Sequence, residues 1–198
     1  MARLAALIGL AGVLGLGLWL ANFTPLGIDR GPQSSRDTAM MIDLALIALF
    51  GLQHSGMARR AWKQAAQGIG RYIPERSAYL LATTLALAVL FAFWKPLPLT
   101  VWEIPPAVML GQIVGLVLIG WAVATLNAHA FLGLQPQPPG LQTGGPYRWM
   151  THPIMAGTLL VLWCVPRMSQ GHLLFSAAMT VYAVAGTALE SRDLARTP

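Results

Sequence analysis

The sequence predicts an all-α, polytopic helical membrane protein with five to six transmembrane helices, the fifth of them short. Of its 198 residues, 56% are hydrophobic and only 10% are charged, whereas about 25% of a typical soluble domain is charged. Six apolar segments follow one another along the chain, and most approach the roughly 20 residues that a helix needs to cross a bilayer. We expect residues 1–198 to form a single transmembrane domain.

The six predicted helices differ in how easily each could cross a membrane. They are Leu4–Leu20, Thr38–Gln53, Tyr79–Trp94, Ala107–Leu126, Ile154–Val165 and Leu173–Leu189. The first exceeds a usual signal-peptide core and lacks a clear cleavage site, so we expect it to be retained. The second and third need residues from their flanks to span. The fifth lies between Pro153 and Pro166, which predicts a tilted or partly re-entrant segment.

Lysine and arginine are unevenly distributed between the loops. With a cytoplasmic N-terminus, the inside holds Arg3, Arg59, Arg60, Lys63, Arg71, Arg76, Arg148, Arg192 and Arg196, and the outside holds Arg30, Arg36, Lys95 and Arg167. The positive-inside rule therefore predicts that both termini are cytoplasmic. The basic loop Gly56–Ser77 carries most of this bias, either for orientation alone or as an amphipathic segment on an anionic leaflet.

Charge and cysteine content exclude several classes of protein. The net charge of +6 does not predict a nucleic-acid partner, because the basic residues lie in short loops between apolar runs, where orientation signals belong. The single cysteine, Cys164, excludes an intrachain disulfide and a cysteine cluster for a metal. It lies in an apolar run, and we expect a small buried side chain there.

The stretch from Gly144 to Gly157 combines a turn with a polar helix start. Two glycines and a proline predict the turn, after which Tyr147, Arg148 and His152 bring polar groups to the membrane boundary. Pro153 occupies the first helical turn, where its missing N–H would have had no partner anyway. The unpaired N–H groups and the positive dipole end of such a helix can hold a carboxylate or a phosphate.

Three other predicted helix ends carry polar groups on the same cytoplasmic side. These groups are Gln53 and His54, Asn127 and His129, and Glu190, Arg192 and Asp193. Such groups are costly near a membrane and often functional, although a single histidine is also a common interfacial group and Asn127 a plausible helix cap. Glu190 faces the negative end of its helix dipole and needs a partner, either an arginine or a bound cation.

The predicted convergence of these helix ends indicates a polar pocket that opens to the cytoplasm. An anion site facing a carboxylate would suit a zwitterion, such as an amino acid or the methionine part of S-adenosylmethionine. The residues alone do not choose between these ligands. His172 falls on the opposite side of the membrane, and Asp43 is expected to be an interfacial or paired charge.

Two motifs connect the sequence with a known family. Gly-Pro-Tyr-Arg-x-x-x-His-Pro-x-x-x-Gly runs from Gly145 to Gly157, and Leu-Glu-Ser-Arg-Asp-Leu runs from Leu189 to Leu194. Supporting segments are Phe50–Arg59, Ile73–Tyr79, Phe93–Pro98, Phe131–Gln135 and Gly171–Tyr182. In their order and spacing these pieces resemble the bacterial methanethiol S-methyltransferase family, within the membrane methyltransferases related to isoprenylcysteine carboxyl methyltransferase.

This resemblance implies a multi-pass enzyme of the bacterial inner membrane that transfers a methyl group from S-adenosylmethionine to methanethiol, giving dimethyl sulfide. The implied cofactor-binding residues are Tyr147, Arg148, His152, Pro153, Gly157 and Glu190. The sequence departs from the family pattern at Thr151, where the family usually has arginine, and at Ser191, where it usually has a second acid. It also stops at Pro198 without the Tyr- and Arg-rich tail of the family.

Thiol methylation requires a base, because the thiolate is the nucleophile. His54, His129 and His152 are candidates for that base, and Arg148 or Arg192 could supply a positive charge to the acceptor. Among these, we assign the catalytic role to His54, His129 and Arg192. A small lipophilic acceptor could arrive from the lipid bilayer.

Two alternatives remain open at this point. The NnrU-type membrane proteins have a similar small helical body, and in that case His54 and His152 could be axial ligands of haem b. A catalytically degenerate relative with a binding role would bind neither haem nor a methyl donor.

Overall fold

The structure is a computed structural model that describes residues 1–59, 62, 74–135, 140 and 142–195, with side chains described as far as residue 187. It is predominantly helical, as predicted, and forms two compact units. Residues 1–99 with 132–136 make the first unit, and residues 100–131 with 137–198 make the second. Each unit is described by itself, and the expectation of a single domain stays a prediction.

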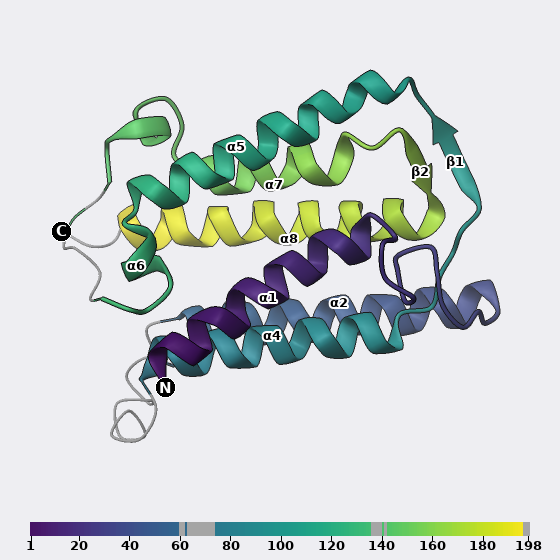
Figure 1. Ribbon diagram of the computed structural model, residues 1–198, viewed down its shortest axis with the longest axis horizontal. Helices are drawn as coiled ribbons and strands as arrows, with labels where there is room; N and C mark the ends of the chain where they lie inside the picture. Colours follow the sequence, from purple (N-terminus) through teal and green to yellow (C-terminus); the bar gives the residue numbers. More distant parts are fainter. Residues whose placement is uncertain (60–61, 63–73, 136–139, 141, 196–198) are drawn as a thin grey trace. The chain divides into compact units, whose positions relative to one another are not determined.

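The first unit is built from three helices (Figure 1). These are α1 (Ala2–Leu20), α2 (Arg36–Ala58) and α4 (Glu75–Phe93). Helix α4 packs against both α1 and α2. Ser35 caps α2, since its side chain accepts a hydrogen bond from Thr38 N at 3.4 Å. Helix α2 therefore begins two residues before the predicted segment. Helices α1 and α4 also begin and end within a few residues of the predicted positions.

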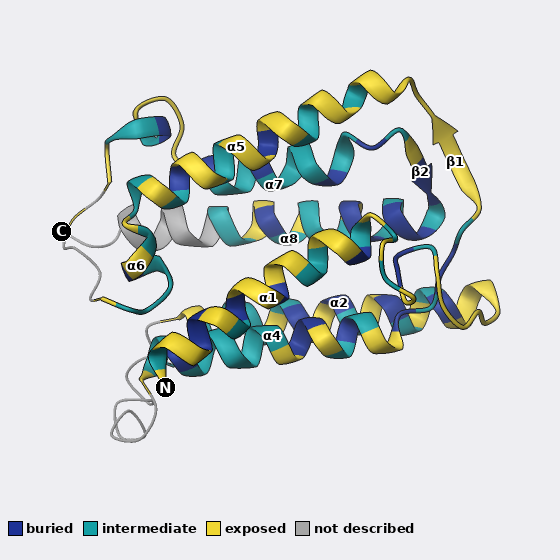
Figure 2. Ribbon diagram, viewed as in Figure 1, coloured by how far each residue is buried: buried dark blue, intermediate teal, exposed yellow. Residues whose placement is uncertain are grey.

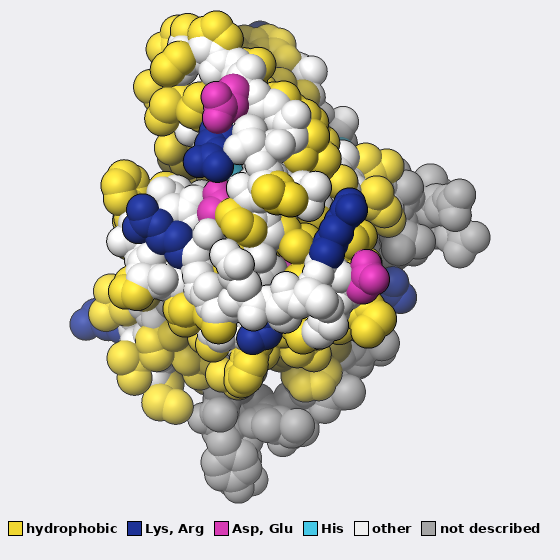
Figure 3. Space-filling model, turned by 90° about the vertical axis from the view of Figure 1, so that its right-hand side faces the viewer, with side chains coloured by type: hydrophobic (Ala, Val, Ile, Leu, Met, Phe, Trp, Pro, Cys, Tyr) yellow, Lys and Arg dark blue, Asp and Glu magenta, His cyan; other side chains and the backbone are white. Residues whose placement is uncertain are grey.

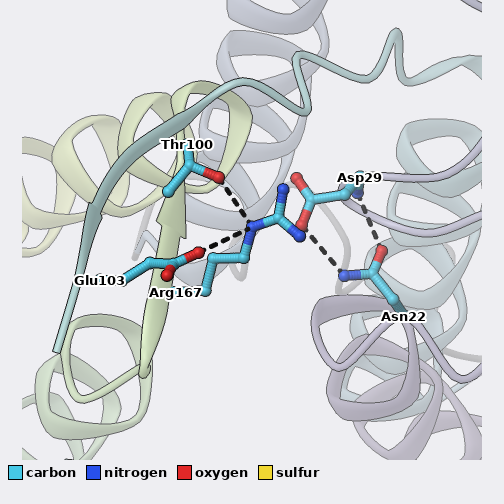
Figure 4. A network of polar contacts seen from close by, with 5 residues as sticks. All are labelled: Asn22, Asp29, Thr100, Glu103 and Arg167. Atoms are coloured by element: carbon cyan, nitrogen blue, oxygen red, sulfur yellow. Dashed lines mark hydrogen bonds and ion pairs between the residues drawn. The ribbon is translucent and has the colours of Figure 1, made fainter. Parts of the chain in front are cut away.

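An aromatic corner closes the ends of α1 and α4. The Trp19 ring stacks on Phe91, with centroids 5.3 Å apart, and meets the edge of Trp94 at 5.2 Å. Trp94 Nε1 donates to the carbonyl oxygen of Ile28 at 3.0 Å. Nearby in the sequence, Asn22 Nδ2 donates to Asp29 Oδ2 at 3.1 Å (Figure 4). These contacts hold the segment after α1 against the end of α4.

Asp43 is a buried hydrogen-bond acceptor rather than an interfacial charge. Its side chain is 0% exposed, and its Oδ1 accepts from the backbone N–H of Lys95 at 2.8 Å. Sequence reasoning missed this role because the partner is a backbone group 52 residues away. The bond ties the middle of α2 to the chain that leaves α4.

The second unit contains the remaining elements (Figure 1). They are β1 (Thr100–Glu103), η1 (Pro106–Val108), α5 (Met109–Thr125), α6 (Ala128–Phe131), η2 (Gly145–Arg148), α7 (Pro153–Trp163), β2 (Arg167–Ser169) and α8 (Gln170–Ala195). Helix α7 packs along α5 and also contacts α8. Its 11 residues make it a short helix, as the flanking prolines predicted.

A two-stranded antiparallel sheet joins the segment before α5 to the segment between α7 and α8. In β1 and β2, Thr100 pairs with Ser169 and Glu103 pairs with Arg167. Arg167 Nε donates to Thr100 Oγ1 at 2.8 Å and lies 3.8 Å from Glu103 Oε1 (Figure 4). The sequence analysis did not predict these strands, since each is too short to show alternation. Their ion pair is exposed and contributes little to stability.

Four helices within the described ranges are long and apolar enough to cross a membrane. They are Ala2–Leu20, Arg36–Ala58, Glu75–Phe93 and Pro106–Thr125, and Pro153–Trp163 is a shorter apolar helix. Large apolar side chains on their surfaces are exposed, such as Leu7 and Leu14 in α1 and Leu116 in α5 (Figure 2). Figure 3 shows hydrophobic side chains lying among the charged ones on one face. The protein is therefore a multi-pass membrane protein, and the count of five to six spans stays a prediction.

Candidate functional site

The predicted turn before the fifth helix is a 3₁₀ helix. In η2, Tyr147 N donates to the carbonyl oxygen of Gly144 at 3.1 Å, and Trp149 N donates to Pro146 O at 3.1 Å. Pro146 is buried, while Arg148 is exposed and Tyr147 half-buried. The tight turn thus holds Tyr147 and Arg148 a few residues before α7.

The start of α7 has the geometry expected of an anion site. Pro153 is buried in the first turn, and His152 is the N-cap residue with an extended φ of −129°. The His152 side chain makes no capping hydrogen bond, so it does not compete for the first N–H groups of the helix. The first regular bond from this end is Ala156 N to His152 O at 3.1 Å. The amides of Ile154 and Met155 precede that bond and face the end of the helix.

Gly157 lies where α7 and α5 approach each other closely. A Cβ atom at Gly157 would lie 2.6 Å from the carbonyl oxygen of Gly115 and 2.7 Å from Ile119 Cγ1. A Cβ atom at Gly115 would in turn lie 2.6 Å from the carbonyl oxygen of Gly157. Because these contacts involve backbone, neither position has room for a side chain. Gly157 therefore positions the helix that carries the site, and its assignment to cofactor binding stays a prediction.

Asn127 and His129 differ in what they do. Asn127 follows α5 with φ of 65°, the left-handed conformation in which asparagine commonly ends a helix. Its Oδ1 accepts from His129 N at 3.1 Å and from Ala130 N at 3.4 Å, so it also caps α6. The predicted capping role of Asn127 is confirmed. His129 belongs to the same unit as α7 and its side chain is exposed.

Two predicted site residues lie where only the backbone is described. Glu190 and Arg192 belong to the last turns of α8, and their side chains lie outside the described residues. Most of the basic loop between α2 and α4 lies outside the described residues as well. The roles assigned to Glu190 and Arg192 stay predictions.

His54 belongs to the first unit, whereas the other candidate residues belong to the second unit. It lies in the last turns of α2, where the Tyr79 hydroxyl oxygen of α4 is 2.9 Å from its Nε2. The two units are described separately, so His54 is not placed relative to His152. Sequence reasoning singled out His54 and missed Tyr79, because two residues 25 positions apart on different helices carry no local signal of contact.

His172, expected on the opposite side from the other histidines, has a structural role. It is buried, and its Nε2 lies 3.1 Å from the carbonyl oxygen of Leu162, which also accepts from Ser176 Oγ at 3.1 Å. Leu162 is in the last turn of α7, where carbonyl groups lack intrahelical partners. His172 and Ser176 of α8 therefore close the end of α7.

Among the residues that the structure describes, no three His, Cys, Asp or Glu side chains come together to hold a metal ion. Cys164 is a half-buried free thiol at the end of α7, next to Gly111 of α5. It packs beside α5, but it is half-buried and not fully buried as the sequence predicted.

The sequence is similar to several curated proteins over most of its length. It is 35% identical over 195 residues to methanethiol S-methyltransferase 1 of Bradyrhizobium diazoefficiens, covering 90% of this chain and 68% of the relative. It is 36% identical over 185 residues to the methanethiol S-methyltransferase of Pseudomonas deceptionensis, covering 86% and 71%. Nurim of Pan troglodytes is 27% identical over 178 residues, covering 77% and 66%. No protein-family model and no solved structure matches the sequence.

The apolar helices and the polar start of α7 define a multi-pass helical membrane protein with a candidate anion site. The similarity to the curated relatives specifies it further. The chain belongs to the methanethiol S-methyltransferase family, as the two sequence motifs predicted, and it is an enzyme of the methyltransferase class.

Proposed function

We propose that the protein methylates methanethiol, with S-adenosylmethionine as methyl donor, and releases dimethyl sulfide. The acceptor is the one in the names of its relatives. The observation that supports a donor site most directly is the start of α7, where a buried proline and an uncapped N-terminal turn follow Arg148 and His152. A carboxylate fits such a site, and the methionine part of S-adenosylmethionine carries one.

The residues assigned to the donor site have complementary chemistry. The first amides of α7 and the exposed Arg148 side chain would hold the carboxylate. Tyr147 and His152 contribute polar groups on either side of the turn, and Pro153 and Gly157 fix the course of α7. Glu190 is the acid that would meet the amino group of the ligand.

When bound, S-adenosylmethionine supplies an electrophilic methyl group on a sulfonium sulfur. The protein must align the acceptor with that group and exclude water. A histidine must also remove the thiol proton, because the thiolate is the nucleophile. His54 and His129 are the proposed bases, and Arg192 is the proposed positive charge for the acceptor.

The proposed setting is the bacterial cell membrane, with both termini in the cytoplasm and five to six spans in a single domain. Four apolar helices and the distribution of Lys and Arg support it. In this arrangement a small lipophilic thiol would reach the enzyme through the bilayer. The haem b alternative is not favoured, because the similar proteins that share 30% identity or more are named methyltransferases.

Calorimetric titration of S-adenosylmethionine and its demethylated product into the purified protein tests the donor site. We expect micromolar binding and formation of dimethyl sulfide from methanethiol by the same preparation. Arg148→Gln should weaken donor binding by about tenfold, the worth of one charge-assisted hydrogen bond. Arg167→Gln is the matched control, because it removes an exposed arginine from the β1–β2 sheet.

Two outcomes would overturn the proposal in different ways. A colourless protein that neither binds the donor nor methylates methanethiol or another small thiol would be a degenerate relative with a binding role. A haem absorption band with no donor binding would move the assignment to the NnrU-type alternative.

A further inference from the structure

A group of polar side chains joins α2 to α4 in the first unit. The Tyr79 hydroxyl oxygen lies 2.9 Å from His54 Nε2 and 3.1 Å from His54 Nδ1, so it is within hydrogen-bond distance of both ring nitrogens. The His54 ring also stacks on Phe50, with centroids 5.3 Å apart and planes 25° apart. The imidazole thus contacts both a hydroxyl and an aromatic ring.

Arg76 brings a positive charge to the same group. Its guanidinium carbon lies 5.0 Å from the centre of the Tyr79 ring, within the range of a cation–π interaction. The stem of Arg76 is fixed from another direction by Gly133. A Cβ atom at Gly133 would lie 2.5 Å from Arg76 Cγ, and φ there is +74°, so both space and backbone conformation require glycine.

Gln53 completes the group with an acceptor that has no hydrogen-bond donor among the described residues. Its Nε2 lies 3.4 Å from Thr83 Oγ1 and 3.2 Å from Met57 Sδ. Its Oε1 is buried and accepts no hydrogen bond from any described residue. A buried acceptor without a donor is costly, and a bound molecule with an acidic hydrogen would remove that cost. We call His54, Gln53, Arg76 and Tyr79 the α2–α4 cluster.

A purely structural role explains only part of this arrangement. An interhelical hydrogen bond inside a membrane contributes only modestly to stability, and the pair Gln53–Thr83 already supplies such a bond. Besides that bond, the cluster contains a base (His54), a positive charge (Arg76) and a hydrogen-bond acceptor without a described donor (Gln53 Oε1). These groups could hold a thiol, remove its proton and stabilise the thiolate.

We propose that the α2–α4 cluster binds the small thiol acceptor and deprotonates it. This inference rests on the proposed function and assigns the acceptor side of the reaction. His54 is the base, Tyr79 is a positioning residue that orients the imidazole, and Arg76 stabilises the thiolate. Gln53 Oε1 accepts from the S–H group before the proton leaves.

The chemical step is a single proton transfer. The S–H bond breaks, its proton forms a bond to a ring nitrogen of His54, and its electron pair stays on sulfur. The resulting thiolate is the nucleophile that the sulfonium donor consumes, and the imidazolium later returns its proton to water. No oxidant, reductant or metal takes part.

The first test is Tyr79→Phe, which removes one oxygen and keeps the ring that lies beneath Arg76. We expect kcat/KM for methanethiol to fall by about tenfold, less than the roughly 10²–10⁴-fold that a proton-transfer group itself contributes, because Tyr79 only positions the base. The dissociation constant of S-adenosylmethionine should stay unchanged. Tyr182→Phe removes a hydroxyl from α8 in the second unit and should leave kcat/KM unchanged.

A pH series separates positioning of a base from a structural effect. Rising pH forms thiolate in solution without help from the protein. The deficit of Tyr79→Phe relative to wild type should therefore narrow from about pH 7 to about pH 9. A deficit that is the same at every pH, or that follows loss of thermal stability, would overturn the assignment of Tyr79.

The second test concerns the charge. Arg76→Gln should raise KM for methanethiol and lower kcat, and Arg76→Lys should restore part of both because it keeps the positive charge. Arg59→Gln removes an exposed arginine at the end of α2 and is the matched control. Equal rates for wild type, Tyr79→Phe and Arg76→Gln would overturn this inference and leave the proposed function intact. A wild-type protein that methylates no thiol would instead overturn the proposed function and the inference with it.

Discussion

The four histidines of this chain occupy four different environments. His54 lies in the α2–α4 cluster, His129 is exposed in α6, His152 precedes α7, and His172 is buried against the end of α7. The same side chain is therefore expected to have a different role at each of these positions. Its surroundings determine which role that is.

We predict that His172→Ala destabilises the protein without changing its chemistry. The substitution removes a bond to Leu162 O and leaves a cavity in the second unit, at a cost of about 1–3 kcal/mol. Thermal unfolding in detergent should show a lowered Tm, while methyl transfer per folded molecule stays at the wild-type level. His129→Ala is the control for stability because its side chain is exposed. An unchanged Tm for His172→Ala would refute the capping role.

The sequence was informative about residues that act locally and uninformative about those that act across helices. The turn, the place of Pro153 in the first turn of α7 and the cap at Asn127 follow from neighbours a few positions away, and each was predicted. The partners of His54 and Asp43 are 25 and 52 residues distant. No period or spacing encodes which helix lies beside which, so these contacts could not be derived.

At the scale of elements, the position of α7 depends on one glycine pair. Gly115 and Gly157 let the two backbones of α5 and α7 approach until a single Cβ atom would overlap a carbonyl oxygen. The Gln112 Nε2 atom donates to Val161 O at 3.1 Å, one turn before Gly115 in α5. Small residues and a polar bond between apolar helices are the interactions that associate helices inside a bilayer.

Gly115→Ala should therefore loosen α7 from α5. We expect a loss of about 1–3 kcal/mol through overpacking and weaker donor binding, since α7 carries the candidate anion site. Gly120→Ala is the matched control in the same helix, because nothing lies within 4 Å of a Cβ atom there. Circular dichroism melts and donor titration of the two variants provide the measurement. If both alanines behave alike, the close approach of α5 and α7 is not important for the site.

Helix positions were easier to predict than helix partners. Apolar runs located all six segments within a few residues, because burial in lipid demands an uninterrupted run of apolar side chains. The contact between α5 and α7 could not be predicted, since Gly111, Gly115 and Gly120 look alike in the sequence. Only Gly115 lies against α7, whereas Gly111 lies against Cys164 just after that helix, and Gly120 has no such neighbour.

At the scale of the whole molecule, the prediction concerns orientation. An N-terminal and a C-terminal fusion to green fluorescent protein should both fluoresce in a bacterial host, because that protein fails to mature outside the cytoplasm. Alkaline phosphatase fused at either end should be inactive. Replacing Arg59 and Arg76 by glutamine weakens the positive bias of the loop between α2 and α4 and should lower the fraction of correctly oriented molecules. Phosphatase activity at the C-terminus would contradict the predicted topology.

The shortness of α7 has a consequence for how two dissimilar reactants could meet. Eleven residues rise about 16 Å at 1.5 Å per residue, roughly half of the 30 Å hydrocarbon thickness. A helix of that length, ended at one side by His152 and at the other by the bond of His172 to Leu162 O, cannot keep both polar ends in the headgroups. At least one end of α7 must lie within the membrane, where the hydrocarbon core borders on water. A charged, water-soluble donor and a volatile thiol that dissolves in hydrocarbon share only such a boundary, and a truncated helix creates it inside the membrane.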